Sequence, residues 1–200
     1  NRKKENREEL ARDIANKYKL EIIPPYDDPF IITGQGTIGV EIDQQLKEYH
    51  LKPDIILVPT GGGGLISGIA SYIKNIYKNT KIFSVEPFGF EDHAKSFEKG
   101  KRIKNKNQIG SICDSLLVDK PGRITFEINK KLIHKGLIVT DNEVLMAMRY
   151  ALTNLGLALE PGGAIALAAL IEEKIKFKGK TIIIVLSGSN VDPLLLKKCI

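Results

Sequence analysis

A run of four glycines, Gly61–Gly64, lies between an apolar segment and a segment with helical spacing. The apolar segment, Ile55–Val58, predicts a buried strand, and the apolar positions from Leu65 to Ile73 predict a helix. Because glycine has no Cβ atom, several N–H groups of such a loop can converge on an anion, and the helix N-terminus adds partial positive charge. The pattern therefore predicts a phosphate site, with a tight turn that binds nothing as the alternative.

The residues around the glycines indicate which kind of phosphate group the loop would bind. No Lys-Ser or Lys-Thr pair follows the loop, so the pattern differs from the P-loop that binds nucleoside triphosphates. The uninterrupted glycines also differ from the spaced Gly-x-Gly-x-x-Gly of dinucleotide sites. A Val-Pro-Thr strand end followed by four glycines and Leu65 favours a compact terminal phosphate, and a nucleotide-binding module stays an alternative.

Strands and helices alternate along most of the chain. Short apolar runs predict strands at 20–23, 55–58, 81–85, 136–139 and 181–186. Helical spacing predicts helices at 5–19, 37–49, 65–77, 91–98, 126–132, 140–154 and 164–173. Thr140 and Glu143 form a capping box at the start of one of them. Residues 26–36 are expected to form a loop, and 88–125 are less regular.

This alternation predicts an α/β fold with a parallel-rich sheet flanked by helices on both faces. Ligands of such sheets bind beyond the carboxyl ends of the strands. Polar or glycine-rich residues follow three predicted strand ends, at Gly61–Gly64, at Glu86 and at Ser187–Asn190. Glu160, at the head of an alanine-rich helix, is a fourth candidate for this site.

The composition is that of a soluble globular protein, with 42% hydrophobic and 27% charged residues in a chain of 200. No apolar run approaches the roughly 20 residues that span a bilayer, and no signal peptide is visible. The two cysteines, Cys113 and Cys199, form no CxxC pair, which favours a reducing cytoplasm. The net charge of +6 gathers partly at 95–106, where a solvated loop is favoured over a nucleic-acid surface because aromatic residues are scarce.

Seven short motifs follow one another in this sequence: Ile-Pro-Pro-Tyr-Asp-Asp-Pro at 23–29, Gly-Gln-Gly-Thr-Ile-Gly at 34–39, Pro-Thr-Gly-Gly-Gly-Gly-Leu-Ile-Ser-Gly at 59–68, Val-Glu-Pro at 85–87, Ser-Ile-Cys-Asp-Ser-Leu at 111–116, Glu-Pro-Gly-Gly-Ala at 160–164 and Leu-Ser-Gly-Ser-Asn-Val-Asp at 186–192. Together they resemble the serine/threonine dehydratases, which are pyridoxal-phosphate enzymes of the tryptophan-synthase-β fold, called fold type II. Threonine ammonia-lyase and serine racemase are the most similar subgroups.

The resemblance implies that residues 1–200 are the C-terminal portion of such an enzyme, a partial cofactor-binding large domain without most of the small domain. It also implies an activity in the intact protein: dehydration and deamination of L-threonine or L-serine to 2-oxobutanoate or pyruvate and ammonia. A serine racemase, another hydroxyamino-acid dehydratase and a non-catalytic fragment of such an enzyme are the alternatives. Members of the family form homo-oligomers, and neither nucleic acid nor a membrane is an expected partner.

The same resemblance assigns the residues around the cofactor. Gly61, Gly62, Gly63 and Gly64, with Leu65, are expected to wrap the phosphate of pyridoxal 5′-phosphate. Ser187 is expected to hydrogen-bond the pyridine nitrogen, and Glu160 to lie close to the ring. Both have structural alternatives, since Ser187 could cap a turn and Glu160 could supply negative charge at a helix N-terminus.

A divalent-cation site is also implied. Glu86 and Asp92, with the backbone carbonyl of Phe90 between them, match the cation ligands of some family members. Carboxylate and carbonyl oxygens suit Mg²⁺ or Ca²⁺, and a solvated acidic loop is the alternative. His50, His93 and His134 match no family motif and are expected to be ordinary surface or core residues.

Two features depart from the family pattern. Ser189 stands where the family usually has glycine, and serine would cost roughly 1 kcal/mol if that position required a positive φ. The family's Ser-x-Lys-x-Arg-Gly motif, whose lysine carries the cofactor, and its Ser-x-Gly-Asn-His motif, which binds the substrate carboxylate, do not occur here. No catalytic residue is therefore assigned, and these 200 residues alone are expected to be inactive.

The chain starts at Asn1 rather than methionine, which indicates the interior of a larger protein. We expect such a piece to expose apolar surface when it is isolated.

Overall fold

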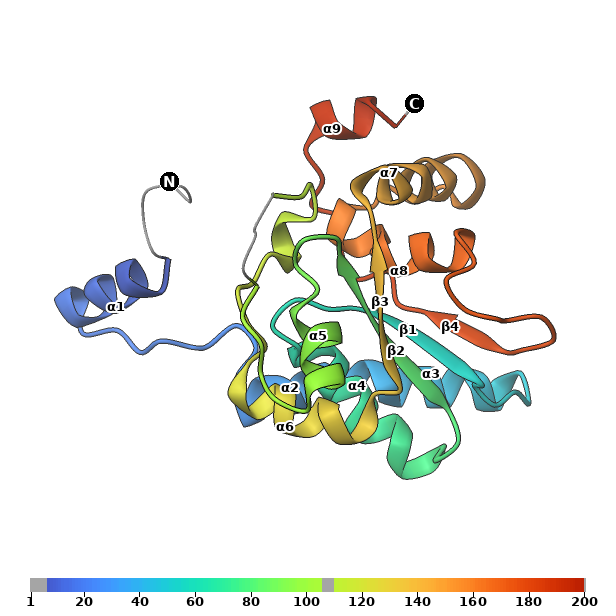
Figure 1. Cartoon of the computed structure of the whole chain (residues 1–200), viewed down its shortest axis with the longest axis horizontal. Coiled ribbons are helices and arrows are strands. Elements are labelled where there is room, and N and C mark those ends of the chain that lie inside the picture. Colours follow the sequence, from blue (N-terminus) through green and yellow to red (C-terminus); the bar gives the residue numbers. More distant parts are fainter. Residues whose placement is uncertain (1–6, 106–109, 200) are drawn as a thin grey trace.

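A four-stranded parallel sheet forms the centre of the computed structural model, which describes residues 7–105 and 110–199 (Figure 1). The strands lie in the order β3-β2-β1-β4. Their bounds are β1 Ile55–Pro59, β2 Lys81–Pro87, β3 Lys135–Val139 and β4 Ile182–Ile184. In register, Ile56 of β1 lies opposite Ile82 of β2 and Ile183 of β4. The predicted parallel sheet is confirmed.

Helices cover both faces of this sheet (Figure 1). On one face lie α2 (Pro29–Gln35), α3 (Thr37–Glu48), α4 (Gly64–Ile76), α5 (Asp92–Lys99) and α6 (Arg123–Leu132). On the other lie α7 (Asp141–Tyr150), a π-helical turn (Ala151–Leu155) and α8 (Pro161–Ile171), with α9 (Pro193–Lys197) beyond them. A short 3-10 turn, Asp114–Leu116, and the N-terminal helix α1 (Arg7–Tyr18) complete the described elements.

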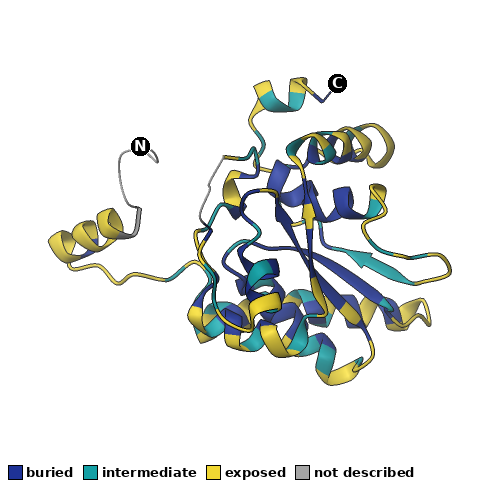
Figure 2. Cartoon of the chain, in the orientation of Figure 1, coloured by how far each residue is buried: buried dark blue, intermediate teal, exposed yellow. Residues whose placement is uncertain are grey.

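Each strand divides its side chains between two hydrophobic cores because successive residues of a strand point to opposite faces. Ile55 and Leu57 of β1 join the core beneath α7 and α8, whereas Ile56 and Val58 join the core beneath α3 and α4. All five residues of β1 are buried, and α8 is buried along almost its whole length (Figure 2). The glycine loop is therefore anchored to the most buried strand of the molecule.

Two sequence predictions about the N-terminal segment are wrong. Residues 20–23 form no strand, because no described strand lies beside them and Ile23 is mostly exposed. The predicted loop 26–36 contains helix α2, which Asp28 caps by accepting hydrogen bonds from the N–H groups of Phe30 and Ile31. An N-cap aspartate followed by proline at the first helical position is a start signal that could have revealed this helix.

The sequence also predicts a capping box at Thr140 and Glu143 and a helix at 5–19. The capping box before α7 is confirmed, since Thr140 N donates to Glu143 Oε2 at 2.6 Å and Glu143 N donates to Thr140 Oγ1 at 3.4 Å. The apolar face of α1 packs on nothing in the described part of the chain: Leu10, Ile14 and Tyr18 are all exposed, and the helix projects from the body (Figures 1 and 2). No described helix is long and apolar enough to cross a membrane.

A buried carboxylate joins α3 to α4. Asp43 accepts hydrogen bonds from Lys47 Nζ at 2.8 Å, Tyr77 OH at 2.8 Å and Tyr72 OH at 3.2 Å. The hydrogen bonds from Lys47 and Tyr77 lower the pKa of Asp43. A carboxylate whose pKa is lower in the folded state than in the unfolded state stabilises the fold at pH values above its unfolded pKa. This contribution is lost as the pH falls through the folded pKa.

Replacing Asp43 with asparagine should therefore lower the free energy of unfolding by about 1–3 kcal/mol at neutral pH, because two partly buried tyrosine hydroxyls lose a charged acceptor. Urea denaturation measures this effect, and the exposed Glu41→Gln on the same helix is the matched control. The difference between wild type and Asp43→Asn should shrink as the pH falls below 3.8, the usual pKa of an aspartate. Equal stability of Asp43→Asn and Glu41→Gln at neutral pH would contradict this account.

Candidate functional site

The glycine loop connects the carboxyl end of β1 to the N-terminus of α4. Thr60 fixes its start, since Thr60 N donates to Val85 O at 3.0 Å and so joins the loop to β2. Gly63 is the N-cap of α4 and has φ 96°, a left-handed conformation that favours glycine. The predicted strand–loop–helix unit is confirmed, and it places the helix N-terminus at the strand edge where ligands of parallel sheets bind.

A cavity of about 240 Å³ opens at this loop. Its walls come from segments far apart in the sequence, and they are Pro25, Tyr26, Gln35, Pro59, Gly61, Gly62, Gly63, Gly64, Leu65, Ser115, Leu116, Val118 and Ser187. The cavity thus brings together the glycines, Leu65 and Ser187, which the sequence analysis assigned to one site. Glu160, Glu86 and Asp92 do not line it.

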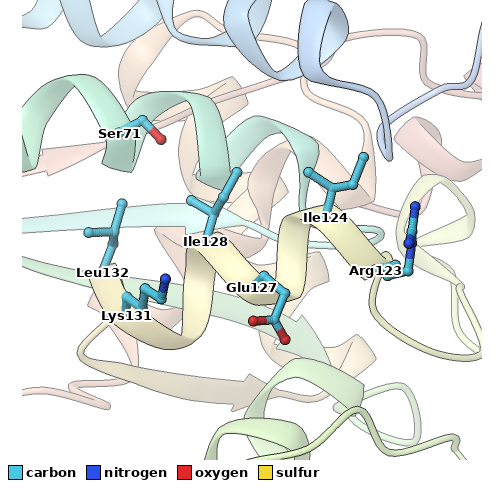
Figure 3. Close-up of a pocket in the computed structure, with 7 residues that line it drawn as sticks. All are labelled: Ser71, Arg123, Ile124, Glu127, Ile128, Lys131 and Leu132. Atoms are coloured by element: carbon cyan, nitrogen blue, oxygen red, sulfur yellow. The ribbon is translucent and has the colours of Figure 1, made fainter.

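A larger hollow of about 570 Å³ lies elsewhere, along α6 and α4 (Figure 3). Its walls are the side chains of Ser71, Arg123, Ile124, Glu127, Ile128, Lys131 and Leu132. It contains none of the predicted cofactor residues and no strand end. We therefore assign the smaller cavity at the glycine loop as the candidate site, because the glycine backbone at a helix N-terminus and the hydroxyl-bearing Ser187 both line it.

Three of the loop glycines are in contact with side chains that leave no room for a Cβ atom. A Cβ on Gly62 would lie 2.3 Å from the ring of Tyr26, and one on Gly64 would lie 2.9 Å from Tyr26 Cβ. A Cβ on Gly63 would lie 2.7 Å from the ring of His93 and 2.9 Å from Asn129 Nδ2. The absence of side chains is thus a packing requirement, and it leaves the loop backbone as the surface that meets a ligand.

Ser187 and Glu160 meet at the loop after β4. Ser187 is exposed and lines the cavity, as its predicted role requires. Glu160 is held by this loop: Glu160 N donates to Gly188 O at 3.1 Å, and Glu160 Oε2 accepts from Asn190 N at 3.2 Å. The Glu160 carboxylate therefore braces the segment that carries Ser187. Ser189 does not adopt a positive φ, so its replacement of a family glycine requires no strained backbone.

The predicted cation ligands form a second, buried cluster at the end of β2 and the start of α5. Glu86 accepts hydrogen bonds from His93 N at 2.7 Å and Ala94 N at 2.8 Å. Asp92 Oδ1 accepts from Asn105 Nδ2 at 3.0 Å, while Asp92 Oδ2, Glu91 Oε2 and Asn105 Oδ1 are buried with no hydrogen-bond partner in the described residues. The alternative of a solvated acidic loop is therefore wrong, because Glu86 and Asp92 are buried.

Burial and mutual repulsion change the acidity of these carboxyls. Burial, followed by the nearby Asp92, raises the pKa of Glu86 well above its usual value. Burial raises the pKa of Asp92 to about 8. Unpartnered buried oxygens of this kind fit the needs of a hard cation. Among the described residues, no three His, Cys, Asp or Glu side chains are close enough to hold a metal, so backbone or amide oxygens would have to contribute.

His93 is a residue near the site to which the sequence analysis gave no role. It is fully buried, in keeping with the expected core alternative, and its ring lies directly beneath Gly63. Burial lowers the pKa of His93 to about 4, although the backbone of Gly62 and Gly61 opposes this shift. Neither ring nitrogen makes a hydrogen bond of good geometry in the described part of the chain. The ring is therefore a neutral support for the loop.

Known proteins resemble this chain over most of its length. A family model described as "Pyridoxal-phosphate dependent enzyme" matches residues 1–188. "Threonine dehydratase 2 biosynthetic, chloroplastic" of Solanum lycopersicum is 38% identical over 184 residues, which cover 91% of this chain and 30% of that protein. "Serine racemase" of Schizosaccharomyces pombe is 35% identical over 191 residues, which cover 96% of this chain and 58% of that protein. The chain thus spans between about a third and somewhat over half of these curated relatives.

Solved structures show the same fold. The processed form of threonine deaminase isoform 2 from Solanum lycopersicum has a TM-score of 0.84 and 36% identity, covering 94% of this chain and 54% of that one. The "Structure of maize serine racemase" has a TM-score of 0.86 and 33% identity, covering 96% of this chain and 58% of that one. The predicted fold class is confirmed by these neighbours.

Proposed function

Because this chain belongs to the family of pyridoxal-phosphate dependent enzymes, we propose that it forms the cofactor-binding large domain of an enzyme that dehydrates and deaminates L-threonine and L-serine. The observation that carries the proposal is the single cavity that the glycine loop and Ser187 share. The names of the relatives support the substrate class, since they include threonine dehydratases and serine racemases. The intact protein would release a 2-oxo acid and ammonia.

Each wall of the cavity has a proposed task. The N–H groups of Gly61–Gly64 and Leu65, with the N-terminus of α4, would bind the cofactor phosphate. Ser187 would hold the pyridine nitrogen, and Glu160 would keep Ser187 in place through the loop that it braces. When bound, pyridoxal phosphate supplies an electron sink for the carbanion formed at the substrate Cα. A hydroxyl partner, unlike a carboxylate, leaves the ring nitrogen largely unprotonated and so tempers that sink.

The group that would carry the cofactor covalently is proposed to lie outside these 200 residues, because no Ser-x-Lys-x-Arg-Gly motif occurs among them. The chain by itself would then bind the cofactor without turning over threonine. Mixing it with a segment that supplies this motif should restore formation of 2-oxobutanoate from L-threonine. Formation of pyruvate from L-serine reports a dehydratase, and interconversion of L-serine and D-serine, measured separately, reports a racemase. Neither reaction with serine and no 2-oxobutanoate from L-threonine would favour a non-catalytic fragment.

A divalent cation is proposed at Glu86, Asp92 and the carbonyl of Phe90. The unpartnered oxygens of Asp92, Glu91 and Asn105 support this site, since a buried ion or water would satisfy them. The two hydrogen bonds that α5 donates to Glu86 place that carboxylate at a helix N-terminus, next to the same cluster. A cation here would fix α5, whose His93 lies beneath the glycine loop.

The cofactor assignment predicts that binding of the cofactor to this chain depends on its phosphate group. The chain should bind pyridoxal 5′-phosphate at least about tenfold more tightly than pyridoxal, because each charge-assisted hydrogen bond from the loop contributes about 1.5–3 kcal/mol. Fluorescence titration with both compounds measures the ratio, and inorganic phosphate should compete with the phosphorylated compound. Equal affinity for the two compounds would show that the glycine loop does not bind the phosphate.

A further inference from the structure

Two carbonyl groups of the glycine loop are held from behind by buried side chains. Gly62 O accepts from Thr125 Oγ1 at 2.7 Å and from Gly122 N at 3.2 Å. Gly63 O accepts from Ser67 Oγ at 2.6 Å, from Asn129 Nδ2 at 3.3 Å and from the Ser67 N–H of α4 at 3.0 Å. Thr125, Asn129 and Ser67 are all fully buried. The loop is thus fastened on the side that faces α6.

Helix α6 is itself fixed by the Tyr-Asp-Asp-Pro segment. Asp27 Oδ2 accepts from Arg123 N at 2.8 Å, and Asp27 Oδ1 accepts from Ile124 N at 2.7 Å and Thr125 N at 3.2 Å. These are three N–H groups of the first turn of α6, which have no partner within the helix. A carboxylate also interacts favourably with the positive end of the helix dipole. The segment 26–29 therefore touches the glycine loop through Tyr26 and positions α6 through Asp27.

The direction of these carbonyls sets the direction of two N–H groups. In a planar trans peptide the C=O and N–H bonds point in opposite directions. The carbonyl of Gly62 belongs to the same peptide as the N–H of Gly63, and the carbonyl of Gly63 to the same peptide as the N–H of Gly64. Hydrogen bonds hold the Gly62 carbonyl toward α6 and the Gly63 carbonyl toward Ser67 of α4 and Asn129 of α6. The N–H groups of Gly63 and Gly64 consequently point away from these donors.

We propose that Thr125 and Asn129 of α6, which Asp27 fixes in part, and Ser67 of α4 are positioning residues that orient the glycine-loop N–H groups toward the cofactor phosphate. The inference rests on the proposed function, because it presumes that the loop binds that phosphate. The three residues touch the loop carbonyls and would not touch the cofactor. Preorganised N–H groups bind an anion without the cost of ordering the loop at the moment of binding.

The substitution that separates positioning from packing is Thr125→Val, because valine keeps the shape of threonine and removes only the hydroxyl. Gly62 O would then keep the single hydrogen bond from Gly122 N. The affinity of the chain for pyridoxal 5′-phosphate should fall about tenfold, which corresponds to one well-formed hydrogen bond at the loop. The affinity for pyridoxal should not change, since pyridoxal has no phosphate. Thr125→Ser, which restores the hydroxyl, should restore the wild-type affinity.

Three outcomes are decisive. The inference is supported if the wild type prefers the phosphorylated compound, Thr125→Val loses this preference and Thr125→Ser recovers it. An unchanged preference in Thr125→Val, or equal losses for both compounds, overturns it while the proposed function stands. Absence of the preference in the wild type overturns the proposed function itself, and the inference with it.

A second variant keeps the test decisive if Thr125→Val does not fold. Ser67→Ala removes the hydroxyl that bonds Gly63 O, keeps the backbone N–H bond of residue 67 to the same oxygen, and leaves α4 with a strong helix former. It should also reduce the affinity for pyridoxal 5′-phosphate about tenfold without changing that for pyridoxal. The matched control is Ser71→Ala, one turn later on α4, whose hydroxyl bonds Ser67 O within its own helix. Equal affinities of Ser67→Ala and Ser71→Ala would overturn the inference.

Discussion

Replacing Gly63 with alanine is expected to abolish measurable binding of pyridoxal 5′-phosphate. Gly63 has φ 96°, a conformation that costs an alanine about 1–2 kcal/mol. The new methyl group would also lie 2.7 Å from the His93 ring and 2.9 Å from Asn129 Nδ2. Both neighbours are fully buried and cannot withdraw without loss of packing, which adds about 1–3 kcal/mol.

The loop can relieve this strain by rotating its own peptide groups. Such a rotation breaks the hydrogen bonds from Ser67 and Asn129 to Gly63 O and turns the N–H of Gly64 away from the phosphate. We therefore expect the affinity for pyridoxal 5′-phosphate to fall by at least about a hundredfold. Fluorescence titration measures the affinity, and urea denaturation shows how much of the fold survives.

The matched control for this substitution is Gly34→Ala. Gly34 lies in α2 near the site, and a Cβ there would meet no atom within 4 Å. Alanine is also the better helix former, so this variant should be as stable as the wild type or slightly more stable. Retained binding by Gly63→Ala would show that the loop does not depend on its left-handed residue and would remove the main support for the phosphate site.

Replacing Asp92 with asparagine is expected to stabilise the cation-free protein at alkaline pH. Mainly through burial, the folded-state pKa of Asp92 is raised to about 8 from the usual 3.8. A group of this kind contributes stability that is fully present below its unfolded pKa and is lost as the pH rises through its folded pKa. The wild type should therefore become less stable as the pH approaches 8, and Glu86, whose pKa is raised in the same direction, adds to the loss.

The measurement is best made between about pH 6.5 and pH 8, below the folded pKa of Asp92 and above the range in which His93 interferes. His93, with a folded pKa of about 4 and a usual value of 6.5, opposes the carboxyls only at lower pH, where protonation of the unfolded chain favours unfolding. In the chosen window one proton difference changes the free energy of unfolding by about 2 kcal/mol. Urea denaturation in the presence of a chelator should show this loss in the wild type and a smaller one in Asp92→Asn.

Addition of Mg²⁺ or Ca²⁺ distinguishes a cation site from two merely buried acids. A bound cation favours the ionised carboxylates, so it should stabilise the wild type and flatten its pH dependence. Asp92→Asn should not respond, whereas Asp13→Asn, which changes an exposed carboxylate of α1, should respond like the wild type. No effect of either cation on the wild type would contradict the proposed site and leave the cluster as a buried acid pair.

The parts of this structure that sequence reasoning found are those governed by local patterns. The β1–glycine loop–α4 unit was predictable because a β-branched apolar run, four glycines and helical spacing follow one another within about twenty residues. The strands β2 and β3 were predictable for the same reason. Strand 20–23 was wrong because an apolar run becomes a strand only where a partner lies beside it, and no local pattern reports a partner.

The parts that sequence reasoning missed depend on contacts between distant residues. Thr125 meets Gly62 across 63 positions, and Asp27 meets Ile124 across 97. Neither pairing has a sequence signal, because a threonine or an aspartate in isolation is compatible with many roles. The bracing of the Ser187 loop by Glu160 is of the same kind, since the two hydrogen bonds that reveal it, one to the Glu160 backbone and one to its carboxylate, join the head of α8 to the loop after β4. These contacts became visible only when the fold placed α6 and α8 beside the loops.

The central claim is that the glycine loop binds the phosphate and Ser187 the ring nitrogen of one cofactor molecule. NMR spectra of the ¹⁵N-labelled chain, recorded during titration with pyridoxal 5′-phosphate, test this most directly. We expect the amide signals of Gly61–Gly64, Leu65 and Ser187 to shift together at one affinity. Shifts confined instead to Arg123, Lys131 and their neighbours along the hollow of α6 would contradict it, because the cofactor would then be bound at the other cavity (Figure 3).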